Sequence, residues 1–181
     1  AVVALMAVTA PLEASAQSRT RSQTIPTQTE IDDDVRMMIA RDDIACDYDT
    51  ARFIGRNGEG RTLYEVGCRG NPGFLLLDTE PAQMVNCIAN NASVAARRAE
   101  NPEAEVGAEC TFESNTNVVA QVTPYIQTAG LSCTVDQARW VGAVTGSDAT
   151  RYEVGCGTSD GFWFDVTPAG EVSNVMSCLQ V

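Results

Sequence analysis

The chain contains the same cysteine-bounded stretch twice. The first copy, CDYDTARFIGRNGEGRTLYEVGC, runs from Cys46 to Cys68, and the second, CTVDQARWVGAVTGSDATRYEVGC, runs from Cys133 to Cys156. The second copy is longer by a residue, which falls in the Gly-rich middle, where a hairpin turn would absorb it. We therefore interpret the chain as a tandem repeat.

The end of each copy predicts a strand of a hairpin. In Tyr-x-Val-x-Cys the apolar residues alternate, so Glu65 points away from them, toward the outer face. If Arg52 lies opposite Glu65, the turn falls on residues 57–60. Arg139 and Glu153 repeat this arrangement. We expect both pairs to be cross-strand ion pairs on the exposed face of a sheet.

Each hairpin is expected to belong to a larger unit. Apolar residues at helical spacing predict a short helix over 34–43, and in the second copy one that starts near Asn115 or Asn117. After turns at 70–73 and 157–161, third strands follow at 74–77 and 162–164. Segments that end in Cys87 and Cys178 close the units. The predicted fold class is α+β: two tandem repeats, each a short helix plus a three-stranded antiparallel meander stapled by disulfides.

The N-terminus predicts export. Residues 1–9 are apolar but too few to span a bilayer, and Ala14-Ser15-Ala16 is a small-residue cleavage pattern. We expect a periplasmic or secreted protein with no membrane span in its mature chain; the competing interpretation is a buried N-terminal helix. The predicted divisions are 1–16 signal peptide, truncated at its start, 17–33 flexible linker, 34–87 repeat 1, 88–114 a partly helical connection, and 115–181 repeat 2.

The seven cysteines are expected to form disulfides. A bend near Asp49 would bring the two cysteines of a hairpin within bonding distance. The predicted bridges are Cys46–Cys68, Cys133–Cys156 and Cys87–Cys110. Cys178 is left without a partner, and we expect it to pair with another chain or with a segment beyond Val181. The sequence has no C-x-x-C pattern and no His, so no metal or other cofactor is expected.

Charge and composition narrow the function classes. The net charge is −12 with no Lys and no His, which disfavours nucleic-acid binding and is compatible with a cationic protein partner or with a solubility role. Without His or Lys the common catalytic bases are missing. Repeated carboxylates remain, Glu65 with Glu153 and Asp49 with Asp136, so the alternative function is a carboxylate-dependent hydrolase of the cell envelope.

We do not expect an enzyme. The expected function is a non-catalytic binding or envelope-associated module with a protein partner. Exposed aromatic residues would anchor such a partner, although most aromatic residues of this kind more often form the core. The candidate anchors are Phe53, Phe74, Trp140, Phe162 and Trp163. Asn91-Ala92-Ser93 matches the glycosylation pattern, which also arises by chance.

The repeated motif carries a resemblance. The pattern Ala-Arg-[Phe/Trp]-[Ile/Val]-Gly, then Tyr-Glu-Val-Gly-Cys, then Gly-Phe resembles secreted, cysteine-containing tandem-repeat proteins of Gram-negative bacteria for which no activity is characterised. The resemblance covers roughly residues 35–178. It implies an exported repeat protein and no particular ligand or catalytic residue.

Overall fold

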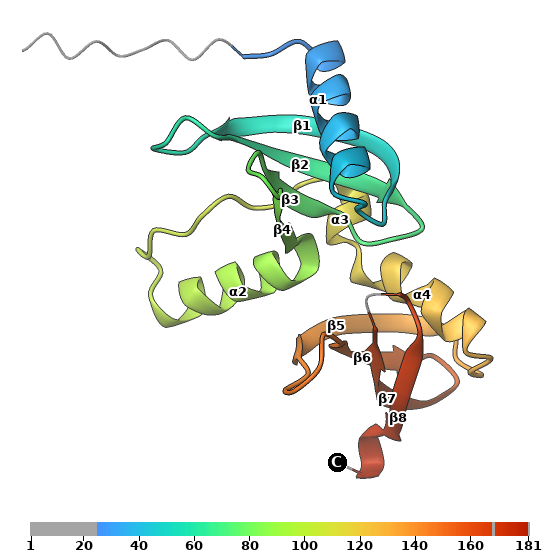
Figure 1. Cartoon of the computed structure of the whole chain (residues 1–181). Coiled ribbons are helices and arrows are strands. Elements are labelled where there is room, and N and C mark those ends of the chain that lie inside the picture. Colours follow the sequence, from blue (N-terminus) through green and yellow to red (C-terminus); the bar gives the residue numbers. More distant parts are fainter. Residues whose placement is uncertain (1–24, 168, 181) are drawn as a thin grey trace, which may run out of the picture.

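The structure is a computed structural model that describes residues 25–167 and 169–180. The predicted signal peptide and residues 17–24 of the predicted linker lie outside these residues. The described chain is an α+β protein with two four-stranded antiparallel sheets (Figure 1). Its helices are α1 (Gln28–Arg41), α2 (Cys87–Glu100), α3 (Glu113–Thr116), α4 (Val118–Thr128) and the 3-10 turn η1 (Cys178–Gln180). Its strands are β1 (Asp47–Arg56), β2 (Thr62–Arg69), β3 (Phe74–Leu77), β4 (Gln83–Asn86), β5 (Val135–Ala143), β6 (Thr150–Cys156), β7 (Ser159–Val166) and β8 (Val172–Ser177). None of the described helices is long and apolar enough to cross a membrane.

Both sheets are meanders, in which each strand pairs with the next one along the chain. The first sheet has the order β1-β2-β3-β4 and the second β5-β6-β7-β8. The prediction of three-stranded meanders is therefore wrong, because the segments expected to close each unit form the edge strands β4 and β8. Most residues of these edge strands are exposed, so neither strand has the half-buried alternation by which a strand is recognised in a sequence.

The first hairpin of each sheet has the predicted register. Arg52 lies opposite Glu65 in one sheet, and Arg139 lies opposite Glu153 in the other. The first turn is closed by the side chain of Asn57, whose amide oxygen accepts hydrogen bonds from main-chain N–H groups within the turn. The duplicated motif thus corresponds to equal pairings in the two hairpins.

A β-bulge near the start of each hairpin brings two cysteines together. The register shifts at Asp49, where the sequence predicts a bend, and at Asp136 in the second hairpin. An extra residue on one strand of an antiparallel pair bends that strand, and the bend lets the cysteine before the strand reach its partner. Three disulfides match the predicted pairs: Cys46–Cys68, Cys87–Cys110 and Cys133–Cys156.

Helix α1 begins at Gln28 and not at Asp34, so part of the predicted flexible linker is helical. The cause is a capping box: the Thr27 N–H donates to the Glu30 carboxylate at 2.7 Å, and the Thr27 hydroxyl accepts from the Glu30 N–H at 3.4 Å. The pattern Thr-x-x-Glu before an apolar residue is a known start signal for a helix. The predicted start therefore missed a signal that the sequence contains.

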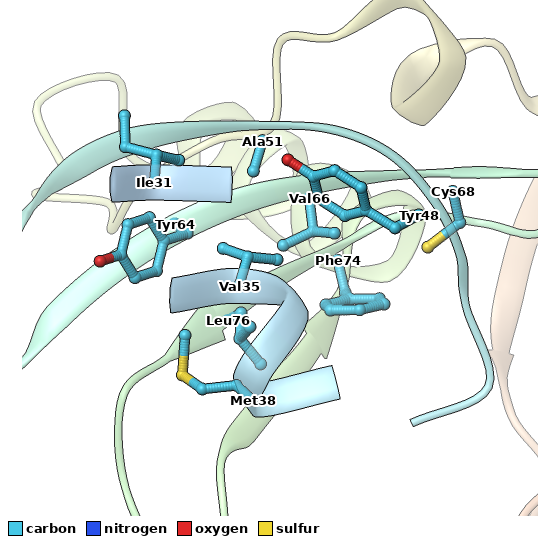
Figure 2. Close-up of a cluster of buried hydrophobic side chains, with 10 residues drawn as sticks. All are labelled: Ile31, Val35, Met38, Tyr48, Ala51, Tyr64, Val66, Cys68, Phe74 and Leu76. Atoms are coloured by element: carbon cyan, nitrogen blue, oxygen red, sulfur yellow. The ribbon is translucent and has the colours of Figure 1, made fainter. Parts of the chain in front are cut away.

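The first core lies between α1 and the inner face of the first sheet. Ile31, Val35 and Met38 project from one side of α1 toward Val66 and Leu76 (Figure 2). The three helix residues follow the spacing of an amphipathic helix. Each large apolar side chain that is fully buried in this way contributes roughly 1.5–3 kcal/mol.

The second core repeats this arrangement with α4. Val122 and Ile126 of the helix pack with Val154 and Phe164 of the second sheet. Asn117 caps the helix, because its side chain accepts a hydrogen bond of 3.0 Å from a main-chain N–H in the first turn. Asn117 is one of the two starting points that the sequence analysis offers.

Strand β7 is longer than predicted. It spans Ser159–Val166 and pairs with β6 as far as Cys156, so the turn expected over 157–161 is reduced to two residues. The Gly-Thr-Ser-Asp-Gly composition resembles a loop, but Gly161 is needed inside the strand. A Cβ atom there would lie 2.4 Å from the carbonyl oxygen of Val154.

Candidate functional site

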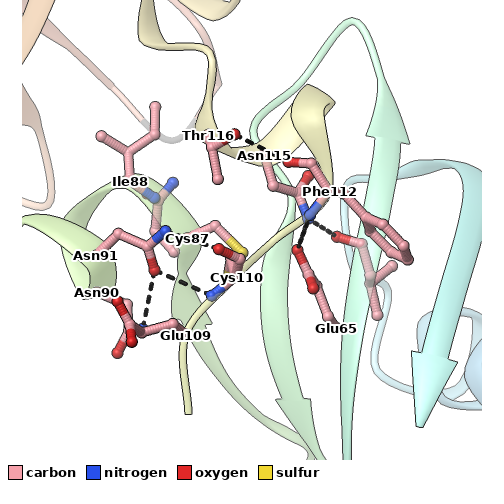
Figure 3. The surroundings of a disulfide bond; sticks show 12 residues. Glu65, Cys87, Ile88, Asn90, Asn91, Glu109, Cys110, Phe112, Asn115 and Thr116 are labelled. Atoms are coloured by element: carbon pink, nitrogen blue, oxygen red, sulfur yellow. Dashed lines mark hydrogen bonds between the residues drawn. A yellow bond between two sulfur atoms is a disulfide. The ribbon is translucent and has the colours of Figure 1, made fainter. Parts of the chain in front are cut away.

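The outer face of the first sheet, which is the face away from α1, is covered by part of the connection between the two units. After α2 the chain returns across the sheet as residues 108–116, which we call the covering segment (Figure 3). A disulfide between Cys87 and Cys110 fastens it. The Asn91 side chain also donates to the Cys110 carbonyl at 2.9 Å and accepts from the Cys110 N–H at 3.0 Å. The asparagine of the Asn-Ala-Ser pattern therefore has a structural role.

Glu65 lies at the centre of this attachment, and its side chain is 0 % exposed. One carboxylate oxygen accepts from Arg52 Nε at 2.6 Å. The other accepts from the main-chain N–H groups of Thr111 and Phe112, both at 2.8 Å, and from the Asn115 amide at 3.0 Å. The prediction that this pair lies on an exposed face is wrong for Glu65, because the covering segment buries it, whereas the Arg52 side chain is 35 % exposed.

The pKa of Glu65 lies below its usual value. Burial alone would raise this pKa, because it penalises the charged form. The hydrogen bonds from Phe112, Arg52, Asn115 and Thr111 outweigh burial and lower it. Glu65 is therefore an anion at neutral pH, and its charge holds the covering segment on the sheet.

Asn115 completes the attachment. Its side chain is buried, and its amide donates to the Val66 carbonyl at 3.1 Å in addition to Glu65. Gly73 makes room for it: a Cβ atom on this glycine would lie 2.0 Å from the Asn115 side-chain oxygen. The outer face of the first sheet thus binds the covering segment through a cysteine, two main-chain N–H groups and an asparagine side chain.

The outer face of the second sheet carries a similar ion pair without a cover. Arg139 Nε donates to the Glu153 carboxylate at 2.7 Å. The Glu153 side chain is 28 % exposed and that of Arg139 is 68 % exposed. Trp163 lies opposite Glu153 on β7, and Met176 lies opposite Trp163 on β8. These side chains form a row across the sheet that mixes charged and apolar groups.

A hollow of about 350 Å³ lies beside this row. Its lining includes Arg139, Glu153, Gly161 and Cys178. Cys178 follows β8 directly, as Cys87 follows β4. The Cys178 sulfur lies 3.9 Å from a Glu153 carboxylate oxygen. The hollow therefore occupies the position that the covering segment fills on the first sheet.

Cys178 is a free thiol in the described chain, which contains all seven cysteines, as the sequence analysis predicts. Burial raises the pKa of this thiol, and the negative charge of Glu153 raises it further. The thiol is therefore held in its protonated form at neutral pH. Because the thiolate is the nucleophile, the raised pKa of Cys178 predicts a slow reaction of this thiol with disulfides.

The five predicted binding aromatics do not gather in one patch. Phe74 is buried in the first core, and Phe53 packs against that core. Trp140 and Phe162 pack against the second core. Trp163 alternates with these core residues and lies on the outer face of the second sheet. A binding role for Trp163 stays a prediction, and the other four residues have packing roles.

The repeated aspartates, Asp49 and Asp136, and the buried Asp165 also have structural roles. Asp49 and Asp136 are the bulge residues, and Asp49 accepts from Arg69 at 2.9 Å. Asp165 is buried and accepts two bonds from Arg151, at 2.7 and 2.9 Å. The hydrogen bonds from Arg151 outweigh burial and lower the pKa of Asp165. Asp165 is therefore an anion held by an arginine.

One group of possible metal ligands occurs in the described residues. The ligand atoms of Glu65, Cys87 and Cys110 all lie within 4.8 Å of one another. The two sulfur atoms are bonded to each other, and both Glu65 oxygens accept hydrogen bonds. No ligand atom is free, so the group fastens the covering segment and does not form a metal site.

Sequence reasoning missed the residues that bury Glu65. Thr111 and Phe112 act through their main-chain N–H groups, which no side-chain motif reveals. The position of Cys178 beside Glu153 could have been inferred, because Cys87 and Cys178 close equivalent segments of the two copies. The sequence signal for this position is that the cysteines occur in the same order in the two copies.

Comparisons with protein-family models, with curated proteins and with solved structures find no match to this chain. The functional hypotheses therefore depend on the chemistry of the two outer faces.

Proposed function

We propose that the chain is an exported, non-catalytic binding module that captures a polypeptide on the outer face of its second sheet. The observation that carries this proposal is the difference between the sheets. Residues 108–116 cover the outer face of the first sheet and bury Glu65 completely, whereas Glu153 and its neighbours face a hollow. Because no described segment covers the outer face of the second sheet, this face offers a surface on which another chain could bind.

Export is supported by two independent features. The three disulfides are typical of the periplasm or the extracellular space, where thiols are oxidised. The apolar run at residues 1–9 and the small-residue pattern at 14–16 resemble the end of a signal peptide. We further propose that the two helix-and-meander units arose by tandem duplication, since their hairpins have equal registers.

The open face has the chemistry of a protein-binding surface. Met176 is exposed and Trp163 is half-buried, so both supply some apolar area, and Arg139 supplies a guanidinium group that is mostly exposed. Tryptophan, methionine and arginine are the residue types enriched where proteins bind one another. The net charge of −12 favours a partner with positive charge around the contact.

The alternative function, a carboxylate-dependent hydrolase, has less support. Such an enzyme needs a carboxyl group whose pKa is raised, so that it can donate a proton near neutral pH. In the described chain the two fully buried carboxylates, Glu65 and Asp165, both have lowered pKa values. Both are committed to arginines.

Position-specific photo-crosslinking in cells that export the chain tests the proposed function. A benzoylphenylalanine at Met176 would lie on the open face, and one at Val85 would occupy the matching position beside Leu75 on the first sheet. We expect polypeptide crosslinks at Met176 that exceed those at Val85 by roughly fivefold, and Trp163→Ala to reduce them, because a central aromatic anchor carries much of a binding energy. Equal crosslinking at the two positions would contradict the proposal.

A further inference from the structure

The two outer faces correspond position by position. In each sheet an arginine on the first strand lies opposite a glutamate on the second, and this glutamate lies opposite an apolar residue on the third strand. A cysteine directly follows the fourth strand of each sheet. On the first sheet these residues are Arg52, Glu65, Leu75 and Cys87, and on the second they are Arg139, Glu153, Trp163 and Cys178. The first sheet therefore shows how such a face is occupied.

The carboxylate and the sulfur also have matching positions. Glu65 lies within 4.8 Å of the sulfur atoms of both Cys87 and Cys110. Glu153 lies 3.9 Å from the Cys178 sulfur, and within the described chain this sulfur is bonded to no second cysteine. A cysteine bonded to Cys178 would bring the main-chain N–H groups that follow it next to Glu153.

The glycine beside the Asn115 side chain on the first sheet also has a counterpart on the second sheet. Gly73 leaves room for the Asn115 side chain, which fills the space where a Cβ atom would stand. Gly161 occupies the matching position, and the nearest atoms to its missing Cβ belong to the main chain of Val154 and Gly155. No side chain of the described residues takes the part of Asn115 there.

We propose that this hollow binds a cysteine-bearing segment of a partner protein and joins it to Cys178 by a disulfide. The segment has the form Cys-x-x-x-x-Asn: the two residues after the cysteine donate their N–H groups to Glu153, and the asparagine lies over Gly161. Residues 108–116 are not that segment, because Cys110 is already bonded to Cys87. The occupant is a segment of another protein, as the proposed binding function has it. The inference rests on the proposed binding function and specifies its partner.

The covalent step is a thiol–disulfide exchange. The Cys178 thiolate attacks a sulfur of a disulfide that contains the partner's cysteine, the new sulfur–sulfur bond forms, and the old one breaks. The leaving thiolate takes up the proton that Cys178 has lost. The partner's disulfide is the oxidant in this exchange, so no further oxidant is needed.

Glu153 has two opposite effects on this step. Its charge adds to burial in raising the pKa of the Cys178 thiol, so we expect the free thiol to react slowly with small disulfides. The N–H groups of an arriving segment bond to the carboxylate and offset its charge. Docking and bond formation are thereby coupled, which a thiol at an unstructured site would not show.

The test uses the full chain with Cys178 as a mixed disulfide with glutathione. A synthetic peptide of residues 110–116, Cys-Thr-Phe-Glu-Ser-Asn-Thr, competes with glutathione, and intact mass measures the ratio of the two adducts. We expect the peptide to be favoured by about 30-fold, since hydrogen bonds to a charged group are the strong ones. The same peptide with Asn115→Leu should lose most of this preference.

Glu153→Gln separates docking from simple thiol reactivity. The variant should lower the peptide preference by about tenfold, because the charge-assisted bonds are lost. It should also speed the reaction of free Cys178 with glutathione disulfide, because loss of the carboxylate charge lowers the pKa of the thiol. Cys178→Ser should form neither adduct.

Three results would overturn the inference. They are equal affinity for peptide and glutathione, an unchanged preference with the leucine peptide, or oxidation that gives only Cys178-linked dimers of this chain. Crosslinking at Met176 does not involve the thiol, so it can succeed when the peptide shows no preference. In that case the proposed function stands and the cysteine-bearing partner is excluded.

Discussion

Glu65 and Glu153 have the same partner type and the same register, but only Glu65 is buried. In Glu65→Gln the NH2 group would face either the Arg52 guanidinium or the N–H donors on the other side, so two donors would face each other. Arg52 would also lose its counter-charge. We expect this change to lower the free energy of unfolding by about 3 kcal/mol, because the buried carboxylate loses its charge-assisted hydrogen bonds and leaves buried donors without a good acceptor. Urea unfolding measures it.

Glu153→Gln is the matched control. Its carboxylate has the same arginine contact but is partly exposed to water, which screens the interaction. The cost should stay below about 1 kcal/mol, the usual range of an exposed pair. Equal costs for the two variants would show that the covering segment does not strengthen the Glu65 interaction.

The lowered pKa of Glu65 predicts acid sensitivity of its surroundings. A carboxyl whose pKa is lower in the folded state stabilises the fold above its unfolded pKa, which for glutamate is about 4.3. This stabilisation is lost as the pH falls from there through the lowered folded pKa. Amide exchange in residues 110–116 should therefore rise steeply below about pH 4 relative to exchange in α1.

Glu65→Gln again provides the comparison. With no carboxyl to protonate at this position, the extra rise in exchange at low pH should be much smaller. If both proteins show the same rise, other carboxylates control acid unfolding of the covering segment.

At the scale of elements, the covering segment depends on its disulfide. Cys87–Cys110 closes a loop between residues 23 positions apart. Replacing both cysteines by serine should cost roughly 3 kcal/mol by the chain-entropy model. It should also open residues 108–116 to amide exchange and to proteases, while α1 and its core keep their protection.

Cys178→Ser is the matched control for this prediction, since it also removes a thiol but breaks no bridge. Its stability should equal that of the parent chain. Loss of protection throughout the first sheet in the double variant would mean that the covering segment and the sheet unfold as one unit.

The sequence predicts the elements whose signals are local. The repeat spacing gives the hairpin register, and Asn117 marks the start of a helix. The edge strands escape prediction because their residues are exposed on both faces. The burial of Glu65 escapes it for another reason: the groups that surround Glu65 are main-chain N–H groups far along the chain, which leave no sequence pattern.

At the scale of the whole molecule, the two units differ in how many faces of their sheets are covered. The first sheet lies between α1 and the covering segment, whereas α4 covers the inner face of the second sheet. A sheet with an open face buries less apolar area, and burial is the main source of stability. The second unit should therefore open more readily.

This difference predicts the order in which the disulfides are reduced without denaturant. Cys87 and Cys110 are 0 % and 3 % exposed, whereas Cys133 and Cys156 are both partly exposed. Thiol–disulfide exchange needs direct access to sulfur, so a buried bridge must wait for local opening. As the reductant concentration rises, Cys133–Cys156 should be lost first and Cys87–Cys110 last, as measured by differential alkylation and peptide mapping.

Glu65→Gln tests the cause of this order. The variant weakens the hold of the first sheet on the covering segment, so Cys87–Cys110 should be reduced at a lower reductant concentration. Cys133–Cys156 lies in the other unit and should be unaffected. Reduction of Cys87–Cys110 before Cys133–Cys156 in the parent chain would contradict this prediction. It would show that the covered first sheet opens more readily than the second, and that contacts other than those with α4 stabilise the second sheet.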